Sequence, residues 1–392
     1  MKQEMKKDPL ESFSLAEARR LVTDLFEPNP WIYWTDFMVT ISVGMACFPV
    51  ISHAPSIPVR LVAFVVCALA FYRASIFTHE MVHLPGKKWK PFRFAWNMLC
   101  GIPFLIPSFT YYTHLDHHRR KHYGTRRDAE YLPLAAQPPY KTVLYLMQSL
   151  VAYPLAIIRF GIVTPLSWIS PAVRDFAAKH ASSMIMDPFY IRPLPSAKER
   201  RVWRIQELLC FAWVVGLATV YIRGVIPFTG KPLPWDFLPK LYGLSVAIML
   251  LNSIRTLGSH RFLGADEEEF TFTEQLVDSV NHPGHAIVGP LWAPLGQRYH
   301  ALHHLFPSMP YHHLGTAHYR LMEQLPADSA YRMTNSPGLT ATLVDLWRQA
   351  RSSARGVAPV PPWHVQKYQE PNGVDASSRR ETAEVEVYSE SR

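Results

Sequence analysis

The chain has 392 residues, of which 48% are hydrophobic, 13% aromatic and only 18% charged, and its formal net charge is +9 at pH 7. A typical soluble domain carries roughly 25% charged residues, so this chain has little charge with which to cover a soluble surface. The composition excludes a disordered chain, a collagen and a coiled coil. The four cysteines lie in apolar stretches without a C-x-x-C pair, which argues against a disulfide scaffold, a zinc ribbon and an iron–sulfur site.

The first part of the chain predicts a transmembrane hairpin. Residues 1–30 are polar and charged, without the short apolar core of a secretory signal, and are expected to form a cytoplasmic segment. Two apolar stretches follow, at about 31–52 and 57–78, separated by H-A-P at 53–55. A helix needs ~20 residues to cross ~30 Å of hydrocarbon, so each stretch is long enough to span a bilayer.

Later apolar stretches differ in how proline interrupts them. Residues 94–113, 142–158 and 160–173 each contain proline or adjoin it, and we interpret them as broken or interfacial segments, with a further hairpin left open for the last two. Residues 208–222 and 241–254 are uncharged and predict a third and a fourth crossing. The fold expected is therefore an all-α integral membrane protein with four transmembrane helices in two hairpins.

This topology places both termini and the histidine-rich segments on one face, where a helical cap would hold the histidines. Basic runs at 119–127 and 198–204 adjoin the apolar segments, and the positive-inside bias makes that face cytoplasmic. No nucleic-acid-binding motif accompanies these runs, so no nucleic-acid partner is expected. The membrane domain is predicted at 31–325, followed by a cytoplasmic segment at 326–392 that is disordered after about residue 366.

The 18 histidines are strongly clustered. Three boxes stand out: H-E-M-V-H at 79–83, H-L-D-H-H at 114–118 and H-A-L-H-H at 300–304. Residues three or four apart share a helix face, so the histidines of each box face one way, and the two imidazoles of the first box can reach one metal ion. A zinc ion takes three or four protein ligands, so eight imidazoles suit two ions rather than one. All-imidazole sites suit iron, copper, zinc or nickel, and the ligand type alone does not choose among them.

Taken alone, the first box also matches the zinc metalloprotease signature H-E-x-x-H, in which Glu80 would be the general base. That hypothesis predicts one zinc ion and leaves the other two boxes unexplained. A passive metal-binding or lipid-binding membrane protein is a third hypothesis. The metal content of the purified protein distinguishes the three.

In this order and with these apolar separators, the boxes resemble the membrane fatty-acid desaturase and hydroxylase superfamily. The sequence G-T at 124–125 followed by D-A-E-Y at 128–131 resembles the G-T…D-P-E-Y stretch after its second box, with Ala129 in place of proline. The sequence H-L-F-P-S-M-P-Y-H at 304–312 resembles the run that closes its third box. The resemblance covers about residues 31–325.

This resemblance implies a non-haem centre of two iron ions that uses O2 to oxidise a long-chain acyl or lipid substrate, with fatty-acid desaturation as the expected outcome. A hydroxylase, a ketolase and a terminal-alkene-forming decarboxylase are the alternatives within the superfamily. It also implies a ninth ligand, His260, at the end of the fourth crossing, where Thr256 replaces the asparagine of acyl-CoA desaturases. The implied ligands are His79, His83, His114, His117, His118, His260, His300, His303 and His304.

Metal-bound histidines usually donate their other ring N–H to a carboxylate, a carbonyl or water, and the candidate acceptors are Glu80, Asp116 and Asp278. Electrons must come from another protein, because the chain has no G-x-G-x-x-G fingerprint and no cysteine set for an iron–sulfur cluster. A separate reductase with a ferredoxin or small cytochrome is implied, and the basic cytoplasmic surface would dock an acidic carrier.

Overall fold

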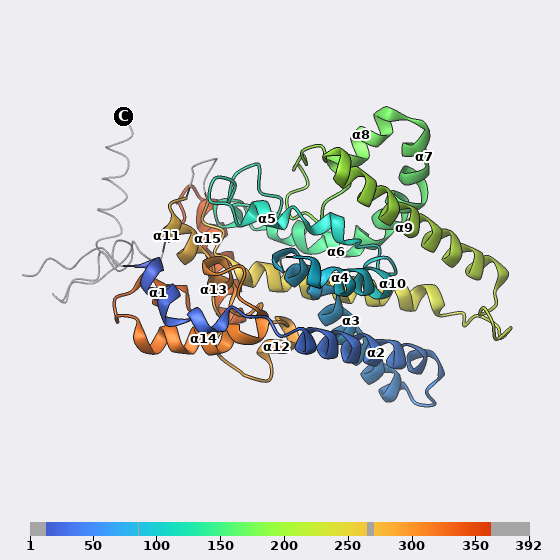
Figure 1. Ribbon diagram of the computed structural model, residues 1–392, viewed down its shortest axis with the longest axis horizontal. Helices are drawn as coiled ribbons and strands as arrows, with labels where there is room; N and C mark the ends of the chain where they lie inside the picture. The colour runs from blue at the N-terminus through green and yellow to red at the C-terminus, as the bar shows by residue number, and fades with distance from the viewer. Residues whose placement is uncertain (1–12, 85, 265–269, 362–392) are drawn as a thin grey trace, which may run out of the picture.

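The computed structural model describes residues 13–84, 86–264 and 270–361, and within these ranges the chain is helical with no β-strand (Figure 1). The all-α prediction is therefore confirmed for the described residues. The segment after about residue 366, which the sequence predicts to be disordered, lies outside them.

Within the described ranges, five helical stretches are long and apolar enough to cross a membrane. They are α2 (Pro30–His53), α3 (Ile57–His83), the run Tyr140–Ile169, α9 (Ala197–Arg223) and α10 (Phe237–Ser259). Large apolar side chains such as Met45, Leu155 and Ile205 stay exposed along them. A water-soluble surface rarely exposes such extended apolar area, so these faces suit contact with lipid.

The α2–α3 hairpin forms where the sequence predicts it. Asn29 caps the start of α2, and Pro30 stands at the first position, where its missing N–H costs nothing. The two helices pack along their length, and α3 continues through the first histidine box to His83. The second hairpin is looser: α10 packs against α3 and α6 (Tyr140–Ile158), while α9 packs against the turn that follows α6.

The run 140–169 is the fifth candidate, so the predicted count of four crossing helices is not confirmed. It consists of α6, a π-helical turn (Arg159–Val163) and α7 (Thr164–Ile169). Both flanks of the segment return to one end of the molecule. Before it, the N–H of Ala135 donates to the carbonyl of Phe262; after it, the N–H of Met184 donates to the carbonyl of Thr110, near the second box.

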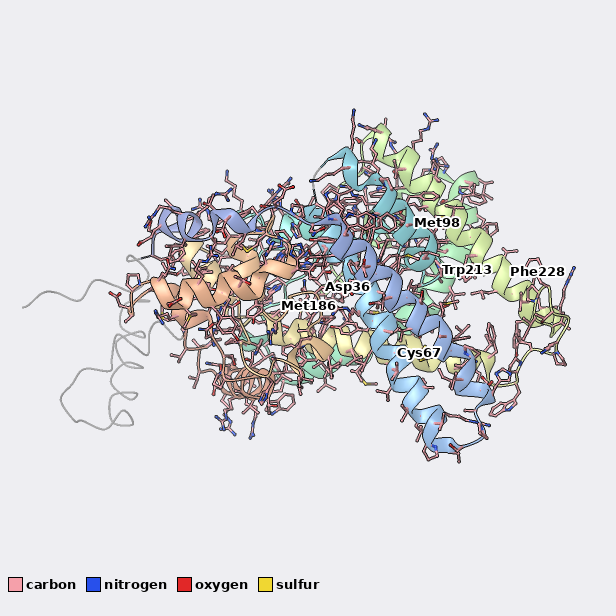
Figure 2. The ribbon with its side chains drawn as sticks, turned by 60° about the horizontal axis from the view of Figure 1, so that its bottom comes forward. Asp36, Cys67, Met98, Met186, Trp213 and Phe228 are labelled. Carbon is pink, nitrogen blue, oxygen red and sulfur yellow. The ribbon has the colours of Figure 1, made fainter. Side chains whose placement is uncertain are left out.

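Short helices gather at the end of the long helices that carries the histidines, and Phe228, between α9 and α10, lies at the opposite end (Figures 1 and 2). These short helices are α1 (Leu15–Leu21), α5 (His114–His117), α11 (Phe272–Asp278), α12 (Gly289–Trp292), α13 (His300–Leu305), α14 (Tyr311–Gln324) and α15 (Leu339–Ser353). Elsewhere, α4 (Lys90–Trp96) lies beside α3, where the Trp96 Nε1–H donates to the Ala74 carbonyl, and α8 (Pro171–His180) packs on α7. Single turns lie at Thr23–Leu25, Lys87–Trp89, Asn97–Gly101, Ser108–Tyr111, Leu134–Ala136 and Ala330–Thr334.

A polar and aromatic junction holds α14 against the α2–α3 hairpin. Asp36 on α2 pairs with Arg73 on α3 and accepts a hydrogen bond from the Tyr311 hydroxyl at 2.7 Å. Figure 2 shows Asp36 where α2 approaches the short helices. The ring of Tyr33 packs edge-on against Tyr311, with centroids 5.0 Å apart. This junction fixes the third box, which directly precedes α14, relative to the first box on α3.

Candidate metal centre

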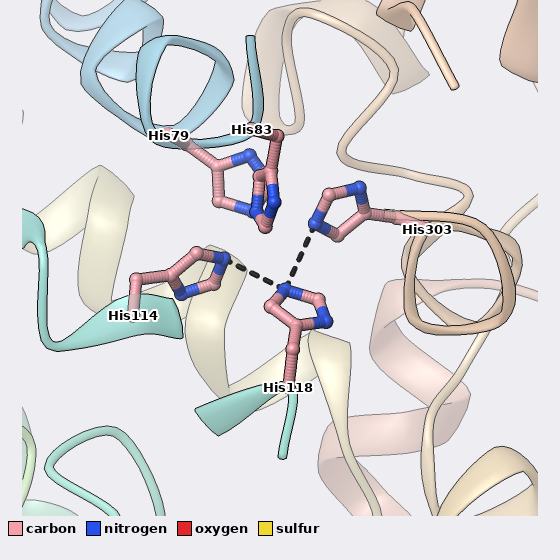
Figure 3. Close-up of side chains that lie close together, drawn as sticks. All are labelled: His79, His83, His114, His118 and His303. Carbon is pink, nitrogen blue, oxygen red and sulfur yellow. Dashed lines mark hydrogen bonds between the residues drawn. The ribbon is translucent and has the colours of Figure 1, made fainter. Parts of the chain in front are cut away.

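Nine histidine side chains converge from α3, α5, α10 and α13 into two groups, and within each group the ligand nitrogens lie within 4.8 Å of one another. The five-histidine group contains His79, His83, His114, His118 and His303, whose rings point toward a common centre (Figure 3). The four-histidine group contains His117, His260, His300 and His304. All nine residues implied by the sequence are thus brought together.

Each H-x-x-H-H box contributes to both groups. In the second box the i, i+4 pair His114 and His118 joins the five-histidine group, whereas His117 joins the other. In the third box the pair His300 and His304 joins the four-histidine group, whereas His303 crosses to the first. The i, i+4 histidines of each box thus share a group, as their common helix face indicates, whereas the i+3 histidine of the second and third boxes lies in the other group.

The spacing of the ring nitrogens fits metal ions at the two centres. Nε2 of His118 lies 2.9 Å from that of His114 and 3.1 Å from that of His303. In the other group, Nε2 of His300 lies 2.9 Å from that of His260 and 3.1 Å from that of His304. Nitrogens bound ~2.1 Å from one ion at right angles would be ~3 Å apart, so the donors already have ligand spacing.

Two further nitrogens of the five-histidine group need a partner. Nε2 of His79 and Nε2 of His83 are buried and make no hydrogen bond within the part of the chain that the structure describes. A buried polar atom without a partner is costly, and a metal ion at the shared centre would satisfy both. The donor set therefore fits a pair of metal ions.

Burial favours the neutral, metal-binding form of most of these rings. Desolvation, followed by neighbouring imidazoles, lowers the pKa of His118, His303 and His304 well below its usual value. A neutral imidazole keeps a lone pair for a metal ion. His117 differs: burial lowers its pKa, but the nearby carboxylates of Asp128, Glu130 and Asp278 together outweigh burial and leave the pKa raised.

Two carboxylates in the loop after the second box receive the outward ring N–H groups. Nδ1 of His117 donates to Asp128 Oδ2 at 2.8 Å, and Nδ1 of His114 donates to Glu130 Oε2 at 3.0 Å. Each bond holds the proton on Nδ1 and leaves the Nε2 lone pair facing the group centre. Neither residue is among the acceptors expected from the sequence, although both lie in the D-A-E-Y motif at 128–131.

The three carboxylates expected from the sequence to accept these N–H groups, those of Glu80, Asp116 and Asp278, make no direct hydrogen bond to the nine histidine rings. Glu80 Oε2 accepts from the Tyr33 hydroxyl at 2.9 Å and from the Tyr311 N–H at 3.3 Å, while Glu80 Oε1 stays 3.8 Å from His79 Nδ1. The side-chain NH2 of Gln297 lies 2.9 Å from His79 Nδ1 instead. Glu80 therefore does not accept a hydrogen bond from His79, and its proposed place as an acceptor for a ring N–H is not found here.

Asp116 pairs with Arg119 at 2.8 Å and His122 at 3.3 Å, neither of which belongs to the two groups. Being adjacent in sequence to these histidines does not bring its carboxylate to them, because on this single helical turn the histidines and Asp116 point in different directions. Asp278 comes closer, but its Oδ2 is 3.8 Å from His260 Nδ1, and the Tyr123 hydroxyl lies between them.

The position of Glu80 also weighs against a zinc protease. In an H-E-x-x-H protease the glutamate must act as a general base beside the metal ion. Here its carboxylate is 4% exposed and is held by Tyr33 and Tyr311 in the junction between α14 and the hairpin. The second and third boxes also contribute histidines to both groups, and the protease hypothesis assigns these histidines no function.

Comparison with known proteins agrees with this site. The family described as fatty acid desaturase matches residues 55–335. A ceramide hydroxylase from Caulobacter vibrioides (strain NA1000 / CB15N) is 37% identical over 338 residues, which cover 86% of this chain and 93% of that protein. No solved structure matches the chain.

Proposed function

The chain belongs to the fatty acid desaturase family and is a membrane oxidoreductase, and from this premise we propose that it hydroxylates a ceramide-like lipid with O2 at two iron ions. The convergence of nine imidazoles into two adjacent groups carries the proposal. The similarity to a ceramide hydroxylase supports the lipid class and favours hydroxylation. Desaturation, the outcome expected from the sequence, is the second candidate. The family match supports desaturation and hydroxylation equally, and only the similar ceramide hydroxylase favours hydroxylation.

Bound iron would supply the oxidation of an unactivated C–H bond with O2, which protein side chains cannot perform. The chain itself would hold the ions and orient the lipid. The carboxylates of Asp128 and Glu130 keep His117 and His114 in the tautomer that presents Nε2. The choice between hydroxylation and desaturation would depend on which carbon lies nearest the ions, where a displacement of ~1 Å matters.

We propose that α2, α3, α9 and α10 cross the bilayer and that the run 140–169 stays on the histidine side. The hydrogen bonds that return both flanks of this run to that side support this topology. The two ends of the described chain also lie there, since α1 packs on α14 and α15 packs on the turn at Leu134–Ala136. The basic runs at the same end support a cytoplasmic orientation for the termini and the site.

The electron donor is proposed to be a separate acidic carrier, a ferredoxin or small cytochrome, that docks on the loop after the second box. The loop carries the exposed basic residues Arg119, Arg120, Lys121, Arg126 and Arg127. It begins next to the proposed ligand His118 and ends at Asp128, which bonds His117, so a carrier bound there would lie close to both histidine groups. Opposite charge at such a surface mainly raises the association rate.

The function is tested by expressing the chain, with a suitable reductase system, in a host supplied with ceramides and isotope-labelled O2. Mass spectrometry should find a ceramide that has gained one labelled oxygen, and a His303→Ala variant should give none. A product that has lost two hydrogens without gaining oxygen would instead assign desaturation. Unchanged lipids in the wild type, with two irons bound, would refute lipid oxidation.

Docking of the carrier is tested by the double variant Arg120→Glu and Lys121→Glu, with Arg200→Glu and Arg201→Glu, in the other basic run, as the matched control. The first variant should raise the KM for the carrier, most strongly at low ionic strength, and leave kcat little changed. Equal effects of the two variants would contradict docking at the 119–127 loop.

A further inference from the structure

The outward nitrogen of His260 meets a phenol rather than a carboxylate. Its Nδ1 lies 2.8 Å from the Tyr123 hydroxyl and 3.3 Å from Ser279 Oγ. By contrast, His114 and His117 contact Glu130 and Asp128 directly. The ninth ring is therefore held by a different kind of partner from these two, although it occupies an equivalent place.

The protons of this contact can be assigned from the donors and acceptors present. A phenol has one proton, and the Tyr123 hydroxyl lies 2.6 Å from Asp278 Oδ2. Because the phenol O–H donates its hydrogen bond to that carboxylate, the phenol oxygen accepts a hydrogen bond from the Nδ1–H of His260. The lone pair of His260 is then on Nε2, which lies 2.9 Å from Nε2 of His300 and 3.2 Å from that of His117.

Asp278 is built to act as the acceptor at the end of this chain. Its Oδ2 also accepts from the Tyr131 hydroxyl at 3.0 Å, and its Oδ1 accepts from the Leu263 N–H at 3.0 Å. Asp278 is 0% exposed, and Tyr123 and Tyr131 are 0% and 3% exposed, so water does not compete for these bonds. Burial raises the pKa of Asp278, and the three donors around the carboxylate oppose that shift.

We infer that Tyr123 is a positioning residue for the four-histidine group, through which Asp278 sets the tautomer and direction of His260. The inference rests on the proposed function, because it takes the group as a metal site. In this relay the carboxylate acts on the ring through a phenol that has no charge of its own. The metal ion of the four-histidine group should then depend on the Tyr123 hydroxyl, whereas the ion of the five-histidine group should not.

The chain offers a matched control. Tyr131 donates to the same Asp278 oxygen as Tyr123, and its ring also lies near His260, with centroids 5.8 Å apart. Its hydroxyl, however, accepts from the Gly264 N–H at 3.1 Å and makes no hydrogen bond to a histidine of either group among the described residues. Tyr131→Phe therefore removes the same atom beside the same carboxylate without touching His260.

The experiment measures iron rather than activity. Purified wild type, Tyr123→Phe and Tyr131→Phe are loaded with ferrous iron, and its transfer to a coloured chelator is followed together with thermal unfolding. Loss of an outer hydrogen-bond partner typically weakens metal binding ~10–100-fold. We expect Tyr123→Phe to lose about one of its two iron equivalents to the chelator ~10–100-fold more readily, while Tyr131→Phe keeps both.

Three outcomes would overturn the relay: unchanged iron retention in Tyr123→Phe, equal loss in both variants, or loss of both iron equivalents together. A fall in thermal stability shared by both variants, with no difference in iron, would count as a merely structural role and also overturn it. A wild type that holds two irons but oxidises no lipid refutes the proposed function and leaves the relay standing. A wild type that binds no metal refutes both.

Discussion

Replacing Asp128 by Asn tests whether the loop after the second box holds His117 in its metal-binding form. The carboxylate is 0% exposed and accepts three hydrogen bonds. Its Oδ2 accepts from His117 Nδ1 at 2.8 Å and from the Gly124 N–H at 3.1 Å, and its Oδ1 accepts from the Glu130 N–H at 2.9 Å. An amide has one oxygen, so at least one of these donors must then face an NH2 group.

The least costly orientation keeps the amide oxygen toward His117 and leaves the Glu130 N–H unsatisfied. A buried donor without a partner costs ~1–3 kcal/mol, which should appear as reduced thermal stability. The His117 ring also loses an ionised acceptor, and such losses typically lower metal affinity or activity ~10–100-fold. At 1.36 kcal/mol per factor of ten, that corresponds to ~1.4–2.7 kcal/mol. We expect a loss of lipid oxidation and of iron within this range.

Asp116→Asn is the matched control, because it makes the same change within the second box at a carboxylate that the structure pairs with Arg119 and His122. Its side chain is 24% exposed, and surface substitutions of this kind usually change stability by less than ~0.5 kcal/mol. Both variants are assayed for labelled lipid product and for iron per purified chain. The reasoning is refuted if Asp116→Asn costs as much as Asp128→Asn, or if Asp128→Asn keeps full iron and activity.

Three further outcomes are expected. Glu80→Gln should keep two irons and measurable lipid oxidation, because Tyr33 and Tyr311 hold the carboxylate; Glu80-dependent cleavage of a membrane protein would favour the protease hypothesis instead. His303→Ala should abolish lipid oxidation while the chain still inserts into membranes, since the ring faces the histidine group and not the lipid-exposed helices. Burial lowers the pKa of His318 from 6.5 to about 4, so its contribution to stability is full above pH 6.5 and is lost as the pH falls to about 4. Between pH 7 and pH 4.5 the free energy of unfolding of the wild type should therefore fall by up to ~3 kcal/mol on account of His318, and the thermal unfolding midpoint should fall with it. Both should fall less in His318→Gln.

The long helices could be predicted where apolar composition alone identifies a membrane-spanning segment. The apolar stretches 31–52 and 57–78, whose charged residues are Asp36, Arg60 and Arg73 alone, became α2 and α3, because ~20 mostly apolar residues are enough to cross the hydrocarbon. The region after residue 140 was harder, since Pro154 lies inside α6 without ending it. There the buried Arg159 in the π-helical turn bonds Glu207 of α9, and an ion pair between residues so distant in sequence leaves no local pattern to detect.

The nine histidines that converge could be predicted because their spacing on helices is a local pattern, whereas the partners of their outward nitrogens depend on how the following loop folds back. Gly124 makes that return: its φ of 72° lies in the left-handed region, and its N–H bonds Asp128. Two carboxylates two residues apart in the loop then meet two imidazoles three residues apart on α5. Each segment of the G-T…D-A-E-Y motif therefore has a physical task that being next to a box does not reveal. The same argument separates Asp116, which is adjacent in sequence, from Asp128, which is adjacent in space.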